Sequence, residues 1–259
     1  MKDSRYGNIL KQSLGLGERE NISLVGAGGK TTLMYLLAKT LSASGYQVIT
    51  TTTTKLLEPG PDETPFLALG EAHDSVLEKL ELHGHVTVAS QRLADGKLQG
   101  INPRQVDGLW ESGKIDYLIV EADGAARRPL KAPAFYEPVI PFSTGLVVAL
   151  VGADGFEALL SEDKVFRSDI FSRLTGLAQG EKITYQAISV TLTHRNGLTR
   201  GTPPAARIVP FVNKVDLDAG LRRSKEFARV ILDSEEPRID RVVLGQVQSD
   251  PPIVEVIYR

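Results

Sequence analysis

A lysine and two threonines follow a cluster of glycines in the stretch VGAGGKTT, residues 25–32. Glycines let backbone N–H groups turn toward an anion, and a following helix adds the partial positive charge of its N-terminus. Lys30 would then reach the β- and γ-phosphates of a nucleotide, and the hydroxyl of Thr31 or Thr32 would ligate Mg²⁺. The sequence therefore predicts a phosphate-binding loop with the nucleotide-binding residues Gly26, Ala27, Gly28, Gly29, Lys30, Thr31 and Thr32.

This loop is shorter than the common one. The pattern G-x-x-x-x-G-K-[ST] would place its first glycine at position 24, which is Leu24 here. The alternative is a glycine turn that only joins a strand to a helix, but such a turn leaves Lys-Thr-Thr unexplained. The spacing G-x-x-G-K-T-T resembles the ATP loop of the Mur ligase family, so the shorter loop is compatible with a nucleotide.

An apolar stretch, DYLIVEADGA at residues 116–125, is predicted to be a strand that ends in two carboxylates, Glu121 and Asp123. A carboxylate at this point can hold Mg²⁺ through water or orient an attacking water. The alternative is a strand end with solvated acids. The E-x-x-G form of EADG resembles the motif of metallochaperone GTPases of nickel enzymes. We favour Glu121 as the magnesium residue, with Asp123 beside it in the catalytic group.

A second apolar run, IVPFVNKVDLD, contains Asn213, Lys214 and Asp216 in the order N-K-x-D, which is the guanine-recognition pattern of GTPases. The Asp216 carboxylate would accept from N1–H and the exocyclic amine of guanine, a donor pair that adenine lacks. The Lys214 stem would lie across the base, and Asn213 would brace the loop. A surface turn of the same sequence is the alternative.

Five threonines at residues 50–54, followed by Lys55, close another predicted strand. Strand propensity alone explains several threonines. Hydroxyls that face phosphate, Mg²⁺ or a substrate at the carboxyl edge of the sheet are the other explanation. We take Thr52, Thr53 and Lys55 as candidate switch or substrate residues.

Three cations, Arg127, Arg128 and Lys131, follow the predicted acidic strand end. They are either charges of a solvated loop or a clamp for an anionic substrate, a partner or the transition-state charge of phosphoryl transfer. Prolines restrain this loop, which favours a preset surface. We place Arg128 and Lys131 among the catalytic candidates, together with Lys30.

Alternating strands and helices position these residues. Apolar runs predict strands at residues 22–25, 46–50, 85–89, 117–120, 146–151, 208–212 and 241–244. Periodic stretches predict helices at residues 31–43, 74–82, 103–111 and 185–192. This order predicts an α/β protein of the three-layer P-loop NTPase-like fold, with a mostly parallel sheet and helices on both faces. We expect a single domain over residues 1–259, with residues 1–20 as an N-terminal extension that packs on it.

Composition limits the classes of partner. Of the 259 residues 42% are hydrophobic, and the formal net charge is −2, so we expect neither nucleic acid nor a membrane as partner. The chain has no cysteine, which excludes disulfides and thiolate metal sites. Neither a signal peptide nor an apolar run of spanning length is present, so we expect a cytoplasmic protein.

The motifs in this order, VGAGGKTT, TTTTK, EADGAARRPLKAPAFYEPVIP, GLTRG and NKVD, resemble the YqeC family. The resemblance covers about residues 21–216, and its most specific block is the one that begins with EADG. It implies Lys30 and Thr31 on phosphate, Glu121 and Asp123 at the metal, and Arg128 and Lys131 as family features. Members of that family often carry Lys-Gly where this chain has Ala126-Arg127.

The resemblance implies an accessory factor for selenium-dependent molybdenum hydroxylases. Such a factor would use Mg²⁺ with GTP or ATP, and its client would be a molybdenum hydroxylase or a protein that supplies its selenium. The alternatives are a small-molecule kinase or Mur-like ATP-dependent ligase, a metallochaperone-type GTPase, and a scaffold that senses nucleotide without hydrolysis.

Overall fold

The structure is a computed structural model that describes residues 3–259. Residues 1 and 2, which belong to the expected N-terminal extension, lie outside the described residues. Most of the chain is arranged around one sheet, which takes strands from residue 20 to residue 258.

This sheet has nine strands, and the eight from β4 to β13 are parallel, whereas β14 pairs with β13 in the antiparallel sense. From one edge to the other the strands are β14 (Ile253–Tyr258), β13 (Arg241–Gly245), β12 (Arg207–Asn213), β10 (Leu146–Gly152), β1 (Glu20–Gly26), β8 (Tyr117–Glu121), β2 (Val48–Thr52), β5 (His85–Ala89) and β4 (Leu67–Leu69). Every residue of β2, β5, β8 and β10 is buried, as expected of parallel strands that are covered on both faces.

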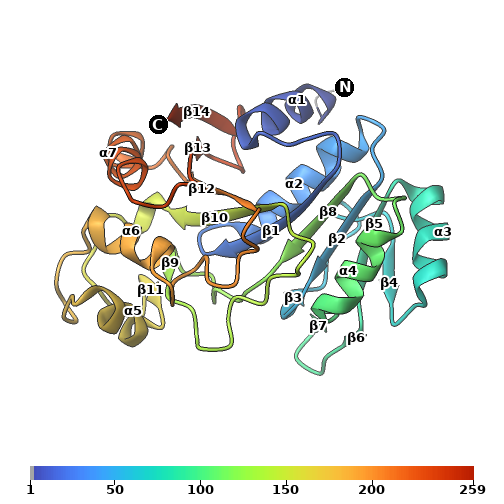
Figure 1. Ribbon diagram of the computed structural model, residues 1–259, viewed down its shortest axis with the longest axis horizontal. Coiled ribbons are helices and arrows are strands. Elements are labelled where there is room, and N and C mark those ends of the chain that lie inside the picture. Colours follow the sequence, from blue (N-terminus) through green and yellow to red (C-terminus); the bar gives the residue numbers. More distant parts are fainter. Residues whose placement is uncertain (1–2) are drawn as a thin grey trace.

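Helices cover both faces of the sheet (Figure 1). On one face, α1 (Asp3–Leu14) packs on α2 (Lys30–Ser42), and their apolar residues meet Leu24, Val148 and Val209. On the opposite face lie α3 (His73–His83), α4 (Pro103–Glu111), α5 (Ser168–Thr175), α6 (Tyr185–Thr193) and α7 (Gly220–Leu232). Successive strand residues such as Leu24 and Val25 point to opposite cores, so the sheet is the middle of three layers.

Two small sheets flank the large one. The strands β3 (Lys55–Leu57), β7 (Lys97–Gln99) and β6 (Gln91–Arg92) form an antiparallel sheet. The strand β9 (Leu130–Lys131) pairs in parallel with β11 (Val165–Phe166), and a short 3₁₀ turn, η1 (Ala153–Gly155), follows β10. These pieces carry the segments that surround the carboxyl ends of the central strands.

The strand order reverses at β1, since the chain passes from β1 to β2 on one side and reaches β10 on the other. Such a reversal opens a crevice at the carboxyl edge of a parallel sheet. The glycine loop joins β1 to α2 at this point. The predicted α/β, P-loop NTPase-like fold with a mostly parallel sheet is therefore confirmed.

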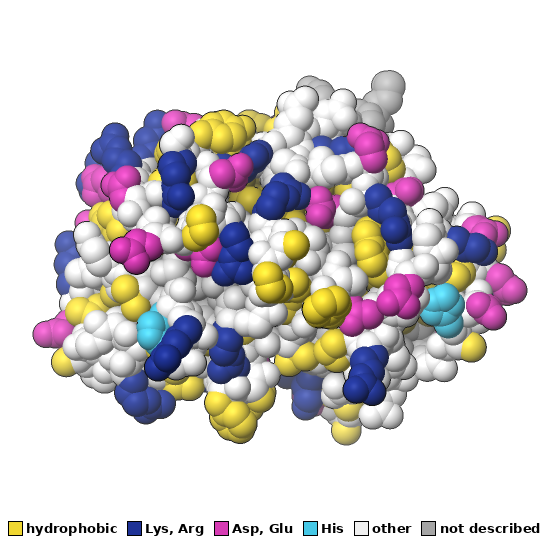
Figure 2. All heavy atoms as spheres, in the orientation of Figure 1, with side chains coloured by type: hydrophobic (Ala, Val, Ile, Leu, Met, Phe, Trp, Pro, Cys, Tyr) yellow, Lys and Arg dark blue, Asp and Glu magenta, His cyan; other side chains and the backbone are white. Residues whose placement is uncertain are grey.

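None of the helices in residues 3–259 combines the length and the apolar character needed to cross a membrane. On the face shown in Figure 2, acidic and basic side chains are interspersed.

Candidate functional site

The phosphate loop turns tightly because its glycines adopt conformations that other residues avoid. Gly28 and Gly29 have φ angles of +88° and +130°. A Cβ at Gly29 would lie 2.4 Å from Asn213 Nδ2, so a side chain does not fit there. Gly29 is also the N-cap of α2 and makes no side-chain capping hydrogen bond. The first N–H groups of α2 therefore have no capping side chain and are suited to bind an anion.

Lys30 is buried beneath this loop and is held by three groups. Its Nζ donates to Gly26 O at 2.7 Å and lies 3.1 Å from Asp123 Oδ1 and 3.7 Å from Glu121 Oε1. Burial alone would lower the pKa of Lys30, but Asp123 and Glu121 outweigh it and raise the pKa above its ordinary value. Lys30 therefore carries its charge at the place where a nucleotide phosphate would bind.

Thr31 and Glu121 face each other across the start of α2 and the end of β8. The Thr31 hydroxyl donates to Glu121 Oε2 at 2.7 Å, and burial raises the pKa of Glu121. A hydroxyl and a carboxylate are hard oxygen donors of the kind that Mg²⁺ prefers, with water and phosphate oxygens as further ligands. The two residues therefore fit the magnesium site expected from the sequence. Within residues 3–259, no group of three or more His, Cys, Asp or Glu residues is arranged to hold a metal ion.

Asp123 contacts the loop from below and does not line the cleft. Its Oδ2 accepts from Gly26 N at 3.0 Å and lies 2.9 Å from Lys131 Nζ, while its contact with Lys30 is an ion pair without hydrogen-bond geometry. Asp123 is fully buried, and Lys131 is almost so. In this structure these two catalytic candidates fix the position of the loop.

The ion pairs continue from Lys131 to the following loop. Lys131 Nζ lies 2.8 Å from Glu137 Oε2, and Arg167 donates to the same oxygen. Burial alone would raise the pKa of Glu137, but Arg167 and Lys131 hold it below its usual value. We call this set the buried charge network; it comprises Lys30, Glu121, Asp123, Lys131, Glu137 and Arg167.

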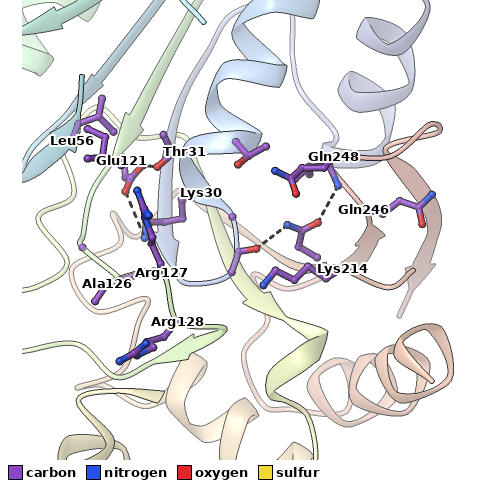
Figure 3. A pocket seen from close by; sticks show the side chains of 18 of the residues that line it. Lys30, Thr31, Leu56, Glu121, Ala126, Arg127, Arg128, Lys214, Gln246 and Gln248 are labelled. Carbon is purple, nitrogen blue, oxygen red and sulfur yellow. Dashed lines mark hydrogen bonds and ion pairs between the residues drawn. The ribbon is translucent and has the colours of Figure 1, made fainter. Parts of the chain in front are cut away.

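The N-K-x-D segment begins at Asn213, the last residue of β12, and contacts the phosphate loop directly. Asn213 donates to Gly28 O at 2.8 Å and accepts from Val247 N at 3.0 Å (Figure 3). Lys214 pairs with Asp154 at 2.7 Å. Asp216 is exposed and accepts from the Ser249 hydroxyl at 3.1 Å. Asn213 thus ties the phosphate loop both to this segment and to the loop after β13.

One cleft of about 1000 Å³ joins these parts. Of the sequence-predicted residues, it brings together Gly28, Gly29, Lys30, Thr31, Thr32, Lys55, Glu121, Arg128, Asn213, Lys214 and Asp216. The remaining predicted site residues do not line the cleft, namely Gly26, Ala27, Asp123, Lys131, Thr52 and Thr53. Thr52 and Thr53 instead donate their hydroxyls to the backbone carbonyls of Glu121 and Val139, each at 2.7 Å.

Sequence reasoning missed one wall of the cleft, residues 246–249 between β13 and β14. This segment carries no motif. The only available signal was its place after the last predicted parallel strand, whose carboxyl end must open at the same edge of the sheet as the phosphate loop. Several other residues that line the cleft were not among the predicted site residues, including Leu56, Leu57, Glu63, Lys97 and Arg127.

The fold and the site define an α/β protein with a P-loop-type phosphate loop. The family model described as "YqeC protein" matches residues 22–169, and the chain belongs to this family. It is 32% identical over 235 residues to "Uncharacterized protein YqeC" of Escherichia coli (strain K12), with 90% of this chain and 89% of that relative covered. The resemblance predicted from the motifs is confirmed.

Two solved structures are similar at low sequence identity. The hydrogenase maturation factor HypB from Archaeoglobus fulgidus has a TM-score of 0.40 and 14% identity, over 96% of this chain and 92% of that one. The signal recognition particle 54 kDa protein from Aeropyrum pernix K1, in complex with GDP, has a TM-score of 0.39 and 15% identity, over 97% of this chain and 46% of that one. At these TM-scores neither likeness carries an argument, and the fold class rests on the strand order and the phosphate loop.

Proposed function

We propose that this protein binds a nucleoside triphosphate with Mg²⁺ in the cleft and hydrolyses it. The observation that supports the proposal is that the phosphate loop, Glu121 and the N-K-x-D segment all line one cleft at the reversal of strand order. Ligands of open α/β sheets bind at this place, and the volume of about 1000 Å³ is in the range of small-molecule sites.

Each residue at the phosphate end has a defined part in this reaction. Lys30 exchanges its contact with Gly26 O for the β- and γ-phosphates and neutralises the charge that develops there. Thr31 and Glu121 would hold Mg²⁺, which would supply positive charge beside the phosphates. The buried contact of Asp123 with Gly26 N keeps the loop in place during the exchange.

The base end favours GTP. The Asp216 carboxylate is at the cleft wall and would accept from the two donors on the guanine edge, and the Ser249 hydroxyl restricts its orientation. Adenine offers no matching donor pair, so a nucleotide that carries it would leave Asp216 desolvated without a partner.

We further propose that hydrolysis serves the maturation of selenium-dependent molybdenum hydroxylases in the cytoplasm. The client is such a hydroxylase or a protein that supplies its selenium, as the family resemblance implies. Phe135 and Phe142 are 87% and 83% exposed on the segment between β9 and β10, and exposed apolar surface is typical of partner sites. A purified client should raise the turnover of nucleotide, and a client that leaves turnover unchanged would contradict this part of the proposal.

Substitution of Lys30 by alanine tests the nucleotide site itself. We expect Lys30→Ala to reduce Mg·GTP binding below detection and to abolish turnover, because the charge at the phosphates is lost. Isothermal titration and a phosphate-release assay measure the two effects. Lys114→Ala is the matched control, because Lys114 is exposed, pairs with Glu81 and does not line the cleft. Binding and turnover at the level of the unmodified protein in Lys30→Ala would rule out the phosphate loop as the site.

A further inference from the structure

A tight turn at residues 125–128 follows the acidic end of β8. Arg128 N donates to Ala125 O at 3.0 Å, and the two central residues, Ala126 and Arg127, have φ angles of +46° and +59°. A residue with a Cβ pays about 1–2 kcal/mol to adopt this left-handed conformation. Backbone strain of this kind is concentrated at functional sites, where it fixes the direction of a side chain.

The turn sends two consecutive arginines in different directions. In Figure 3 the Arg127 side chain extends toward the part of the cleft that holds Lys30, Thr31 and Glu121, whereas Arg128 lies apart from them. Arg128 has an acidic partner, since its guanidinium lies 3.7 Å from Asp163. Arg127 forms no ion pair or hydrogen bond with any of residues 3–259, although it lines the cleft.

The charge balance of the cleft indicates that Arg127 is available to neutralise a bound anion. With every member ionised, the buried charge network is neutral, because three carboxylates meet three cations. A triphosphate with one Mg²⁺ brings a net charge of about −2. Three other cations that line the cleft are compensated by their own acids, namely Lys97 by Asp95, Lys214 by Asp154 and Arg128 by Asp163.

Among the described residues that line the cleft, Arg127 and Lys55 are the cations without an ion pair. A planar guanidinium donates two parallel hydrogen bonds to phosphate oxygens, which an ammonium group does not do. Arg127 is therefore the better suited of the two to follow the redistribution of charge on a transferring phosphoryl group.

We propose that Arg127 is a catalytic residue that contacts the γ-phosphate in the transition state, an inference that rests on the proposed hydrolysis. The oxygen of water forms a bond to the γ-phosphorus, and the bond from that phosphorus to the β–γ bridging oxygen breaks. The nucleoside diphosphate leaves with the electron pair, and the proton of the water is released with inorganic phosphate. Arg127 donates to the oxygens whose negative charge grows during this step.

The test uses Arg127→Gly in the full chain. Glycine adopts a φ of +59° without strain, so the variant should be at least as stable as the unmodified protein. We expect the Kd for Mg·GTP to change less than about threefold, and the single-turnover rate of hydrolysis to fall about 10³-fold. Affinity for Mg·GDP with aluminium fluoride, which mimics the transferring group, should fall with the rate, and Arg127→Lys should recover only part of both.

Two variants at other arginines complete the design. Arg173→Ala, at an exposed arginine of α5 that pairs with Asp169, controls for loss of a surface charge and should hydrolyse at the unmodified rate. Arg128→Ala should slow hydrolysis less than Arg127→Gly does, and the reverse order would overturn the inference. Full turnover in Arg127→Gly with no turnover in Lys30→Ala would overturn the role of Arg127 alone. Binding without any turnover in the unmodified protein would overturn the proposed hydrolysis and this inference together.

Discussion

Asp216 is an exposed carboxylate, and its contribution to nucleotide affinity depends on which base is bound. Among the described residues its hydrogen-bond partner is the Ser249 hydroxyl, which donates to Oδ2, and the residue as a whole is exposed at the cleft wall. We expect Asp216→Asn to weaken GTP about 10- to 100-fold, because hydrogen bonds to a charged group contribute about 1.5–3 kcal/mol, and to leave ATP unchanged. Titration calorimetry with both nucleotides measures the effect. Asp218→Asn, on the same turn but outside the cleft, is the control, and equal losses for the two nucleotides would exclude guanine recognition.

Gly29 lies where the phosphate loop touches the base-reading segment. We expect Gly29→Ala to destabilise the protein by more than about 1 kcal/mol and to weaken nucleotide binding, because the new Cβ would displace Asn213. Gly45→Ala is the matched control: Gly45 has a φ of +90°, and a Cβ there would meet nothing within 4 Å. Urea unfolding of both variants separates the steric cost from the backbone cost. Equal losses in the free energy of unfolding would mean that the contact of the new Cβ with Asn213 does not contribute to the destabilisation.

Several site residues could be predicted from the sequence because spacing alone determines their neighbours. Lys30 and Thr31 open a helix after a glycine turn, and Glu121 ends the strand next to β1, so the structure brings the three together. The sequence alone could not show which of Arg127 and Arg128 extends toward the phosphate end of the cleft. That direction depends on the left-handed conformation of Ala126 and Arg127, which neither alanine nor arginine favours.

At the scale of elements, His85 makes the pairing of β5 with β2 sensitive to pH. His85 is 2% exposed, its Nε2 lies 3.0 Å from Thr50 Oγ1, and burial lowers its pKa from 6.5 to about 4. The folded state therefore binds fewer protons than the unfolded state between these two pH values. The stabilisation from neutral His85 is complete above pH 6.5 and is lost as the pH falls toward 4, by about 3 kcal/mol in total.

We expect His85→Gln to flatten the pH dependence of the free energy of unfolding between pH 6.5 and 4, since glutamine does not titrate and can still bond Thr50. Urea unfolding at intervals across this range measures the slope. His73→Gln, at a partly exposed histidine at the start of α3, is the control and should leave the slope unchanged. An unchanged slope in His85→Gln would place the acid sensitivity elsewhere.

Elements in the centre of the sheet could be predicted more fully than those at its edge. The buried strands β8 and β10 consist almost entirely of apolar residues. The helix α4 has a clear start, because it begins at Pro103 and the side chains of Asn102 and Gln105 each accept from the backbone N–H of the other. The helices α1, α5 and α7 were not predicted, and neither were the edge strands β4 and β14 or the strands of the two small sheets. α7 is rich in charged residues and packs through Phe227, Ala228, Ile231 and Leu232 on one side, while five of the six residues of β14 are exposed or half-buried. Their stability comes from the sheet on which they pack, so local sequence carries a weak signal.

At the scale of the whole molecule, the cleft is lined by segments that lie between residue 28 and residue 249. A bound nucleotide would therefore connect both halves of the sheet. With saturating Mg·GTP, we expect slower amide hydrogen exchange at residues 28–32, 124–128, 213–217 and 246–249. The helix α3, on the far part of the sheet, is the internal control. Protection confined to the phosphate loop would show that the base does not reach the N-K-x-D segment.

The place of β8 between β1 and β2 has a consequence for synthesis on the ribosome. Strands β10, β12, β13 and β14 add outward from β1 in the order in which they are made, so each emerges to meet an edge that already exists. On the other side, β1 and β2 emerge early but do not pair with each other, because both pair with β8. A nascent chain that stops before Tyr117 holds its phosphate loop on a strand without neighbours. The emergence of β8 is therefore the step that joins the two halves of the sheet, and the same strand delivers Glu121 beside Thr31.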